Sequence, residues 1–329
     1  MTALARSVRG KPRPSLLGST ATPGWHRAVE RLIAAVAFVS VAAVLSILAF
    51  VAREAAPLFW EGREHLPDLI FPRQWPGYDV PAHVWQPVGF PPKHDVVPLL
   101  IGTLKITGLA MLVAGPIGLL SAVYVAELAP RRVREVAKPA IELFAGIPSV
   151  VLGFFSLVFI AHFLERLFGL TYRLNALVAA LGLALTIIPV VFTVSEDALR
   201  AVPTSLREAS AALGARRWQT TLRVVVPAAL PGIAAAFVLG FGRAIGETMI
   251  VLMASGNAPV VDASPVSSAR TVTATIAAEL GETARGGDHW RVLFALGVLL
   301  FLITWGLDRI GASAVARLRR RLHGPEAES

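Results

Sequence analysis

The sequence predicts an all-α integral membrane protein with six transmembrane helices. Of the 329 residues, 55% are hydrophobic and only 16% are charged, and the mean hydropathy is +0.63, which lies outside the range of soluble domains. Apolar runs of about 20 residues, enough to cross a hydrocarbon core of roughly 30 Å, recur along the chain. The predicted spans are residues 32–52, 96–126, 143–164, 174–194, 232–254 and, as the shortest, about 290–307.

The first apolar run follows a basic segment, as the core of a signal peptide would. Its 21 apolar residues exceed a typical signal-peptide core, and no clear small-x-small cleavage site follows, so we expect a membrane helix. The chain has no cysteine, which excludes disulfides and thiolate metal sites.

The Lys and Arg residues predict the orientation in the membrane. If the N-terminus is cytoplasmic, the inner segments hold 20 Lys and Arg in 106 residues, whereas the outer segments hold 9 in 89. The positive-inside rule therefore places both termini in the cytoplasm. A basic inner surface facing anionic membrane lipid accounts for the net charge of +9, so nucleic acid is not an expected partner.

These spans and charges predict three parts of the chain. Residues 1–31 form a basic cytoplasmic segment, residues 32–310 form the membrane domain, and residues 311–329 form a basic cytoplasmic tail. Within the membrane domain we expect an outer Pro- and Trp-rich loop at 53–95 and an inner loop at 195–231.

The outer loop has the composition of an irregular segment. Nine prolines between residues 53 and 98 exclude one regular helix. Trp60, Trp75 and Trp85 predict a cap with tryptophans at the membrane interface. Contact with an outer partner is the alternative.

The predicted spans also contain kink-forming and small residues. Prolines are tolerated in spans where neighbouring helices satisfy the freed carbonyls, and glycines allow helices to pack closely. These residues are Pro116, Pro148 and Pro189, together with Gly102, Gly108, Gly115 and Gly118 on the second span. Both features are compatible with a helix bundle that moves.

The inner loop predicts two short helices. Thr204 and Ser205 follow a proline and can cap a helix that runs to a terminator at Gly214. A second helix then extends to Pro227. The residues that we expect to be exposed are Glu208, Arg216, Arg217 and Trp218. Such a surface suits docking of a cytoplasmic protein, and an amphipathic loop lying on lipid is the alternative.

The spacing in this loop resembles the signature loop of ABC importer permeases, Glu-Ala-Ala, three residues, Gly, nine residues, then Ile-x-Leu-Pro. The matching positions here are Glu208, Ala209, Ser210, Gly214, Val224, Val226 and Pro227. Ser replaces the second Ala, and Val replaces both Ile and Leu. The resemblance implies the type I ABC importer permease fold, with coupling helices that sit in a groove of a cytoplasmic ATPase. It assigns to the ATPase-coupling loop Glu208, Ala209, Gly214, Arg216, Arg217, Trp218 and Pro227.

A broader resemblance covers roughly residues 86–310. The runs PLLIGTLKITGLAMLVAGPIGLLSAVYVAELAP, KPAIELFAGIPSVVLGFF and LGFGRAIGETMIVLMASGN are similar to the permease subunits of the phosphate importer, and the last resembles the C-type more than the A-type subunit. This implies import of inorganic phosphate by alternating access. The implied partners are a second homologous permease of the A-type, two cytoplasmic ATPase subunits that bind ATP and Mg, and an extracytoplasmic phosphate-binding protein.

Nothing in the sequence indicates catalysis or a cofactor. The run G-x-x-x-x-G-K-[ST] is missing, so we expect a transport subunit without its own nucleotide site. The seven histidines form no i,i+4 pair on a helix, and we expect them at surface or interfacial positions rather than at a metal. Glu279 and Glu282 lie in an outer segment, and we expect both to be solvated on a short surface helix.

Two charges, Arg243 and Glu247, interrupt the predicted span 232–254. A charge at the centre of a span costs about 2.5–3.5 kcal/mol, so it needs a partner or a wet cavity. The two residues are four apart on one helical face, and a self-neutralising structural pair is one hypothesis. The other, favoured by the resemblance, is that Arg243 faces a water-filled path and binds phosphate with two parallel donors, while Glu247 holds it when the path is empty.

Thr248 and Lys105 complete the predicted substrate path. Lys105 lies in the outer third of the second span, where its charge can add positive potential near the outer mouth. Snorkelling of its side chain to the lipid headgroups is the favoured explanation of this position.

Three alternatives to phosphate import stay open from the residues. The same machine can serve another oxyanion, such as sulfate, molybdate or phosphonate. A secondary transporter or channel can use Arg243 and Glu247 for ion coupling, although it does not need a coupling loop. A signalling role, which reports phosphate to a sensor kinase, is the third.

Overall fold

The computed structural model describes residues 24–61, 66–75 and 77–323, and the chain divides after Phe50 into two compact units. The first unit contains most of α1 (Gly24–Ala55), an apolar helix of 32 residues. Residues 1–23 and 324–329, which belong to the two predicted basic ends, lie outside the described residues.

Six helices in the described part of the chain are long and apolar enough to cross a membrane, which confirms the predicted fold class. They are Ala28–Phe59, Val97–Leu128, Ser149–Phe168, Ala176–Arg200, Arg217–Gly246 and Asp288–Arg320. The first, second and fourth overlap the predicted runs closely, the sixth covers its predicted run but continues to Arg320, and the third and fifth begin at other residues than predicted.

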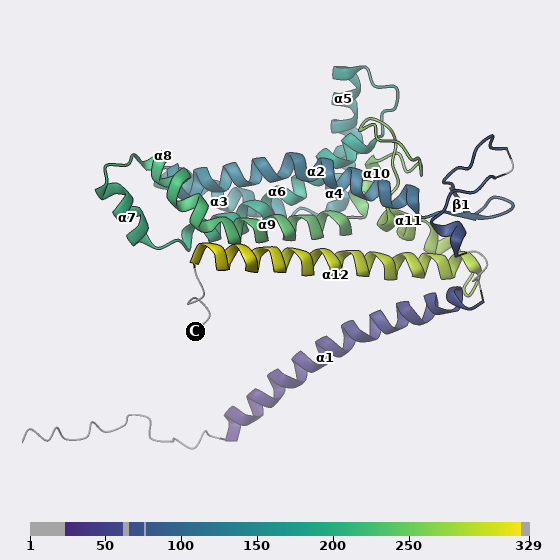
Figure 1. The fold of residues 1–329 in the computed structure, drawn as a ribbon, viewed down its shortest axis with the longest axis horizontal. Coiled ribbons are helices and arrows are strands. Elements are labelled where there is room, and N and C mark those ends of the chain that lie inside the picture. Colours follow the sequence, from purple (N-terminus) through teal and green to yellow (C-terminus); the bar gives the residue numbers. More distant parts are fainter. Residues whose placement is uncertain (1–23, 62–65, 76, 324–329) are drawn as a thin grey trace, which may run out of the picture. The chain divides into compact units, whose positions relative to one another are not determined.

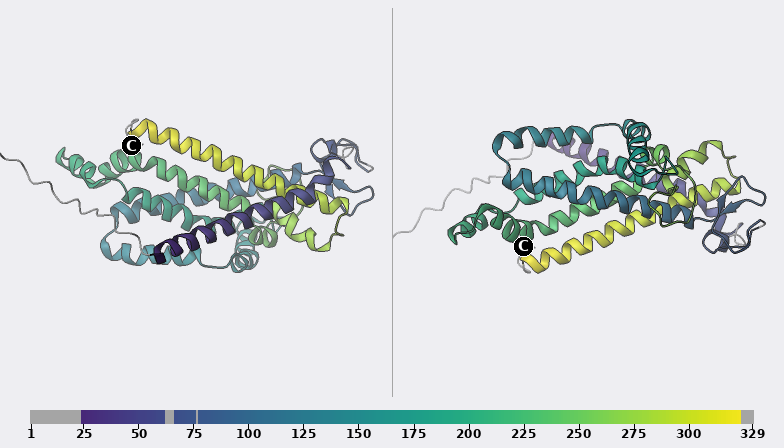
Figure 2. Two further views of the ribbon diagram at one scale, coloured as in Figure 1. Left: turned by 90° about the horizontal axis from the view of Figure 1, so that it is seen from below. Right: turned by 90° about the horizontal axis from the view of Figure 1, so that it is seen from above.

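The second unit is built around three long helices, α2 (Val97–Val123), α6 (Ala176–Arg200) and α9 (Val226–Gly246) (Figure 1). α2 packs along α6, and α6 packs along α9. α12 (Asp288–His323) runs beside α9, as both views of Figure 2 show. The core between α2 and α6 is mostly apolar, and its largest buried members include Ile106, Leu183, Ile187 and Val191.

Shorter elements lie at the ends of these helices. At one end are α3 (Arg131–Ala145), α7 (Thr204–Ala212) and α8 (Arg217–Thr220), and at the other are α11 (Val272–Glu279) and a hairpin of β1 (Trp85–Gln86) and β2 (Lys93–His94) (Figure 1). The rest are α4 (Ser149–Phe155), α5 (Ala161–Phe168), α10 (Met249–Ala254), the 3₁₀ turns η1 (Ala56–Phe59), η3 (Pro67–Leu69) and η7 (Leu280–Glu282), and the π-helical turns η4 (Tyr124–Leu128), η5 (Ser156–Ile160) and η6 (Thr221–Val225).

Glycines allow close packing on the second span at three of the four predicted positions. A Cβ atom added at Gly102 would lie 2.2 Å from the carbonyl oxygen of Arg270. At Gly115 and Gly118 an added Cβ would also meet a side chain at less than 3.0 Å. Gly108 has open space around it, so the prediction is wrong there.

The third span starts later than predicted because the chain breaks at Pro148. Instead of a helix from residue 143, α3 ends at Ala145 and α4 begins at Ser149. Pro148 has ψ 136°, so it takes an extended conformation immediately before the new helix. Pro116 and Pro189, by contrast, lie inside α2 and α6 as predicted.

The fifth span starts earlier than predicted and does not stop at Pro227. α8, η6 and α9 form one continuous helix from Arg217 to Gly246. In the π-helical turn, the N–H of Val226 donates to the carbonyl of Thr221, five residues back. The wider turn lets the helix pass Pro227, which has no N–H to donate. The helix then ends at Gly246, so residues 247–254 do not belong to it.

The outer loop is irregular, as predicted, but two of its three tryptophans are buried. Trp85 pairs with His94 in the hairpin and is 3% exposed, and Trp75 is 6% exposed. Only Trp60, at 63%, has the exposure expected of an interfacial residue. The indole N–H of Trp85 points toward Glu279, so its polar end is satisfied inside the protein and needs no lipid interface.

The predicted solvated surface helix is instead partly buried, and the carboxylate of Glu279 is ion-paired. α11 buries residues Val272–Thr275. Glu279 is 16% exposed, and it pairs with Arg270 at 2.7 Å and with His289 at 3.1 Å. Burial acts to raise the pKa of Glu279, but His289, Arg270 and the Trp85 indole together lower it below its usual value. Glu282 is exposed, as predicted.

Candidate translocation and coupling sites

The charged motif of the fifth span lies at a helix break. Glu247 leaves the helical conformation (φ −70°, ψ 131°), and α10 begins two residues later. One carboxylate oxygen of Glu247 accepts hydrogen bonds from the backbone N–H groups of Thr248 (3.1 Å), Met249 (3.0 Å) and Ile250 (3.4 Å). The carboxylate therefore satisfies N–H groups at the start of α10 that have no carbonyl partner.

The predicted pair between Arg243 and Glu247 does not form. The prediction assumed one helix through both residues, and the break at Gly246 removes the shared helical face. Arg243 is exposed on the last turns of α9, and its guanidinium makes no ion pair or hydrogen bond with any described residue. The cation is left available to a ligand or a partner subunit.

The break is held by packing on both sides. The hydroxyl of Thr273 on α11 donates to the carbonyl of Glu247 at 2.9 Å, and the Thr248 hydroxyl contacts the carbonyl of Gly246 at 3.3 Å. α10 packs on α4 and α6, where Gly153 and Gly182 leave room for it. An added Cβ at Gly182 would lie 3.0 Å from the side chain of Ile250.

Lys105 holds a loop rather than reaching for lipid headgroups, so the snorkelling interpretation is wrong. Its ammonium donates to the carbonyls of Asp262 (3.0 Å) and Ser264 (3.1 Å) and to the hydroxyl of Ser267 (2.8 Å). All three acceptors lie in the segment between α10 and α11. The nearby Asp262 carboxyl has a lowered pKa, first because the Ser264 N–H donates to it. A contribution of Lys105 to the outer mouth stays a prediction.

The coupling segment, residues 201–227, contains the first expected helix, α7, whereas the second, α8, is the first turn of the fifth span rather than a separate helix ending at Pro227. α7 ends at Ala212, and Gly214 has φ +81°, a left-handed conformation that glycine adopts without strain. The cap differs from the prediction, because Pro203 occupies the N-cap position and no side chain caps α7. The hydroxyls of Ser210 and Thr220 lie 2.9 Å apart and join α7 to α8.

All seven residues assigned to ATPase coupling lie on the surface of this segment. They are Glu208, Ala209, Gly214, Arg216, Arg217, Trp218 and Pro227. These residues are therefore accessible on the surface of the described chain.

Arg207 ties the coupling segment to the membrane helices, and the sequence reasoning missed it. Its guanidinium donates to the Glu127 carboxylate at 2.8 Å and to the carbonyl of Leu199 at 2.9 Å. Glu127 is 8% exposed in η4, at the end of the second span. The signal available in the sequence was an acidic residue, Glu127, at the end of the predicted second span, close to the basic residues that follow it.

A second charged cluster at this end was also missed. Glu196 on α6 is fully buried and pairs with Arg200, one turn along the same helix, and with Lys138 on α3 at 2.8 Å. The hydrogen bond to Glu196 is the main reason that the pKa of Lys138 is raised. This cluster joins α3 to α6.

The membrane-spanning helices form a bundle in which one helix breaks after Gly246. The Arg243 cation near the break has no partner among the described residues, and α7 and α8 lie at one end of the bundle. This arrangement fits a membrane transport subunit. The chain belongs to the family of binding-protein-dependent transport system inner membrane components, whose model matches residues 114–322. That range includes both the broken helix and the coupling segment. The chain is accordingly a multi-pass membrane permease subunit.

Curated relatives cover most of the chain. It is 38% identical over 221 residues to a probable ABC transporter permease protein, YqgH, of Bacillus subtilis, covering 67% of this chain and 72% of that protein. It is 34% identical to the phosphate transport system permease protein PstC of Mesorhizobium japonicum, covering 72% and 77%. It is 31% identical to PstC of Xylella fastidiosa, covering 88% and 90%.

Solved structures support the fold. A bacterial alginate ABC transporter in complex with a periplasmic protein matches with a TM-score of 0.56 at 16% identity, covering 90% of this chain and 97% of that one. An inward-facing MetNI methionine ABC transporter matches with a TM-score of 0.51 at 22% identity, covering 68% and 94%. At these identities the likeness establishes the ABC importer permease fold alone.

Proposed function

We propose that this chain is the permease subunit of an ATP-driven importer for inorganic phosphate. The observation that carries the substrate is its similarity, at 31% and 34% identity, to proteins named as phosphate transport system permeases, over 88% and 72% of the chain. The chain would form half of the translocation path.

Arg243 has the chemistry that this function needs. Its guanidinium is exposed near the helix break, and within the described residues it has no carboxylate partner. A guanidinium can bind a phosphate oxyanion through two parallel N–H donors. Because a path must release its substrate as well as bind it, one such contact suits transient binding. Thr248 and Lys105 would lie along the same path.

The proposed assembly rests on two features, the missing nucleotide-binding loop and the exposed surface of the coupling segment. The sequence has no nucleotide-binding loop, so ATP and Mg would be bound by two cytoplasmic ATPase subunits that dock on the exposed face of residues 201–227. A second homologous permease of the A-type would complete the path. A separate phosphate-binding protein would deliver substrate at the outer face, and both termini would be cytoplasmic.

The alternatives are less well supported. An importer for sulfate, molybdate or phosphonate would need the same fold, but the curated relatives described above that name a substrate name phosphate. A secondary transporter or channel is not favoured by the family. A role in reporting phosphate to a sensor kinase is compatible with transport and needs no separate site.

The test is uptake of radiolabelled phosphate in cells whose own phosphate permease is deleted, with sulfate and molybdate as competitors. We expect phosphate uptake that neither competitor reduces. Arg243→Lys should lower uptake about tenfold at unchanged membrane abundance, because lysine lacks the planar fork. Arg285→Lys, at an exposed outer position, is the matched control. Uptake of sulfate that excess phosphate does not reduce would contradict the proposed substrate.

A further inference from the structure

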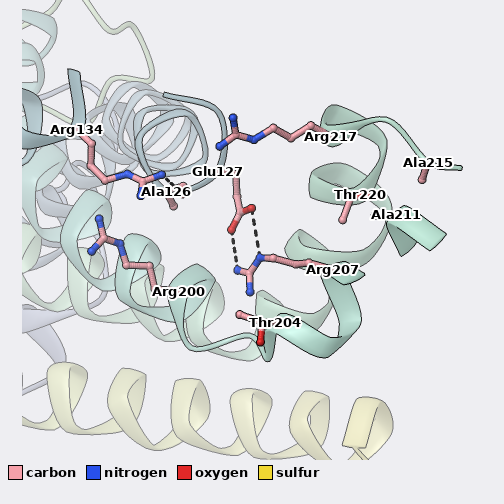
Figure 3. A pocket seen from close by; sticks show the side chains of 10 residues that line it. All are labelled: Ala126, Glu127, Arg134, Arg200, Thr204, Arg207, Ala211, Ala215, Arg217 and Thr220. Atoms are coloured by element: carbon pink, nitrogen blue, oxygen red, sulfur yellow. Dashed lines mark hydrogen bonds and ion pairs between the residues drawn. The ribbon is translucent and has the colours of Figure 1, made fainter. Parts of the chain in front are cut away.

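An open cavity of about 640 Å³ lies between the coupling segment and the membrane helices (Figure 3). Its wall is formed by η4, α3 and the end of α6 on one side and by α7 and α8 on the other. Four arginines and one glutamate line it. The cavity is distant in sequence and element from the helix break at Glu247, so the substrate path does not account for it.

The charges in this cavity do not balance. Glu127 is bound by Arg207, and the Arg200 guanidinium is bound by Glu196, which Lys138 also contacts. The other two arginines have no carboxylate partner among the described residues. The cavity therefore carries an excess of positive charge, and an anion would relieve the mutual repulsion of these arginines.

The two unneutralised arginines come from opposite walls. Arg134 on α3 is half-buried and uses Nε and one Nη to donate to the carbonyls of Val125 and Ala126, which orient the guanidinium but supply no negative charge. Arg217 begins α8, and its guanidinium makes no ion pair or hydrogen bond within the described chain. In Figure 3 the side chain of Arg217 points across the cavity toward Glu127 and Ala126, near which the Arg134 guanidinium lies.

We propose that this cavity is a binding site for a phosphate group, supplied either as inorganic phosphate or as the headgroup of an anionic lipid. A tetrahedral oxyanion offers acceptor oxygens in several directions, which suits guanidinium groups that approach from different walls. Thr204 on α7 also lines the cavity, and its side chain carries a hydroxyl donor. The inference does not depend on which anion the permease moves, because none of these residues belongs to the path at Arg243.

A bound phosphate group would connect two parts of the molecule. It would join Arg134, which is fixed to the end of the second span, to Arg217, which starts the helix that follows the Gly214 turn. The connection adds to the one that Arg207 already makes with Glu127. The site therefore lies where the coupling segment meets the membrane domain.

The experiment uses the full chain with Arg243→Gln in every sample, so that the substrate path does not contribute to binding. The chain is purified in a maltoside detergent, and binding of radiolabelled inorganic phosphate and retention of added phosphatidylglycerol are measured in parallel. Adding Arg217→Gln should weaken one of the two about tenfold, the loss expected for a charged hydrogen-bond donor. The control is Arg223→Gln, an exposed arginine near α8 that does not line the cavity.

The two arms separate the sources of the phosphate group. A loss of inorganic phosphate binding in Arg217→Gln, with Arg223→Gln unchanged, supports a free-phosphate site. A loss confined to phosphatidylglycerol retention supports a lipid headgroup site. Arg134→Gln should reproduce whichever loss is seen. Equal phosphate binding and equal lipid retention with and without Arg217→Gln, including no binding in either sample, would overturn the proposal.

Discussion

Three successive backbone N–H groups at the start of α10 converge on one carboxylate oxygen of Glu247. These donors have no carbonyl in a preceding turn, because α9 has already ended at Gly246. A carboxylate is a stronger acceptor than a neutral side chain and also suits the positive end of a helix. The result is that Glu247 fixes the break, while Arg243 has no ion-pair or hydrogen-bond partner among the described residues.

Removing the Glu247 carboxylate should therefore loosen the break. We expect Glu247→Ala to cost about 1 kcal/mol or more in stability, the loss typical of a helix cap, and Glu247→Gln to cost less because its amide oxygen can still accept. The measurement is the thermal midpoint of the purified chain in detergent. Glu282→Ala, at an exposed outer glutamate, is the control. Equal midpoints for Glu247→Ala and the unchanged chain would rule out the capping role.

The sequence indicated that Glu247 is an important residue, but it did not reveal which groups Glu247 binds. The motif Arg243-x-x-x-Glu247 fits a helical pair by spacing, and glutamate is a good helix former, so nothing local announces that the helix ends at Gly246. The cap becomes visible only when α10 is in place. The partners of Lys105 were not predictable either, because its three acceptors lie more than 150 residues away in the chain.

At the scale of elements, glycine was predictable where it acts locally, because Gly214 adopts a left-handed conformation after α7, as predicted of a helix terminator. Pro148 was expected as a tolerated kink within the third span, but it separates α3 from α4. Pro227 does not end its helix, because the π-helical turn at residues 221–225 precedes it. This wider turn accommodates a residue that has no N–H to donate. A helix end inferred from one proline therefore fails where the preceding turn is widened.

Gly214 lies in the turn that joins α7 to α8. Gly214→Val places a β-branched residue at φ +81°, which costs on the order of 1–2 kcal/mol and should displace α8 from α7. We expect the proposed ATPase to co-purify poorly and phosphate uptake to fall at least severalfold, with normal amounts of permease in the membrane. Ala212→Val, which introduces the same valine side chain on exposed α7 at a position without a positive φ, is the control. Normal co-purification and uptake in Gly214→Val would remove the coupling role from this turn.

At the scale of the whole molecule, hydropathy predicted the six spans because each must be long and apolar to cross the membrane. The contacts that join the spans to the coupling segment were not predictable. Arg207 and Glu127 are 80 residues apart, and Lys138 and Glu196 are 58 apart, so neither pair falls within one helical repeat. The pattern of a single sequence predicts contacts between residues one helical turn apart. These ion pairs depend instead on how distant helices pack against each other.

The second unit also carries a prediction about membrane orientation. The hairpin of β1 and β2 and α11 lie at one end of its bundle, and α3, α7 and α8 lie at the other (Figure 1). Because Lys and Arg are denser in the segments that include α3 and α7, we expect that end to be cytoplasmic. Reporter fusions at Gly77 and Ala258 should give outer-face signals, and fusions at Arg134 and Ala212 should give inner-face signals. An inner-face signal at Ala258 together with an outer-face signal at Ala212 would reverse the orientation and place the coupling segment out of reach of a cytoplasmic ATPase.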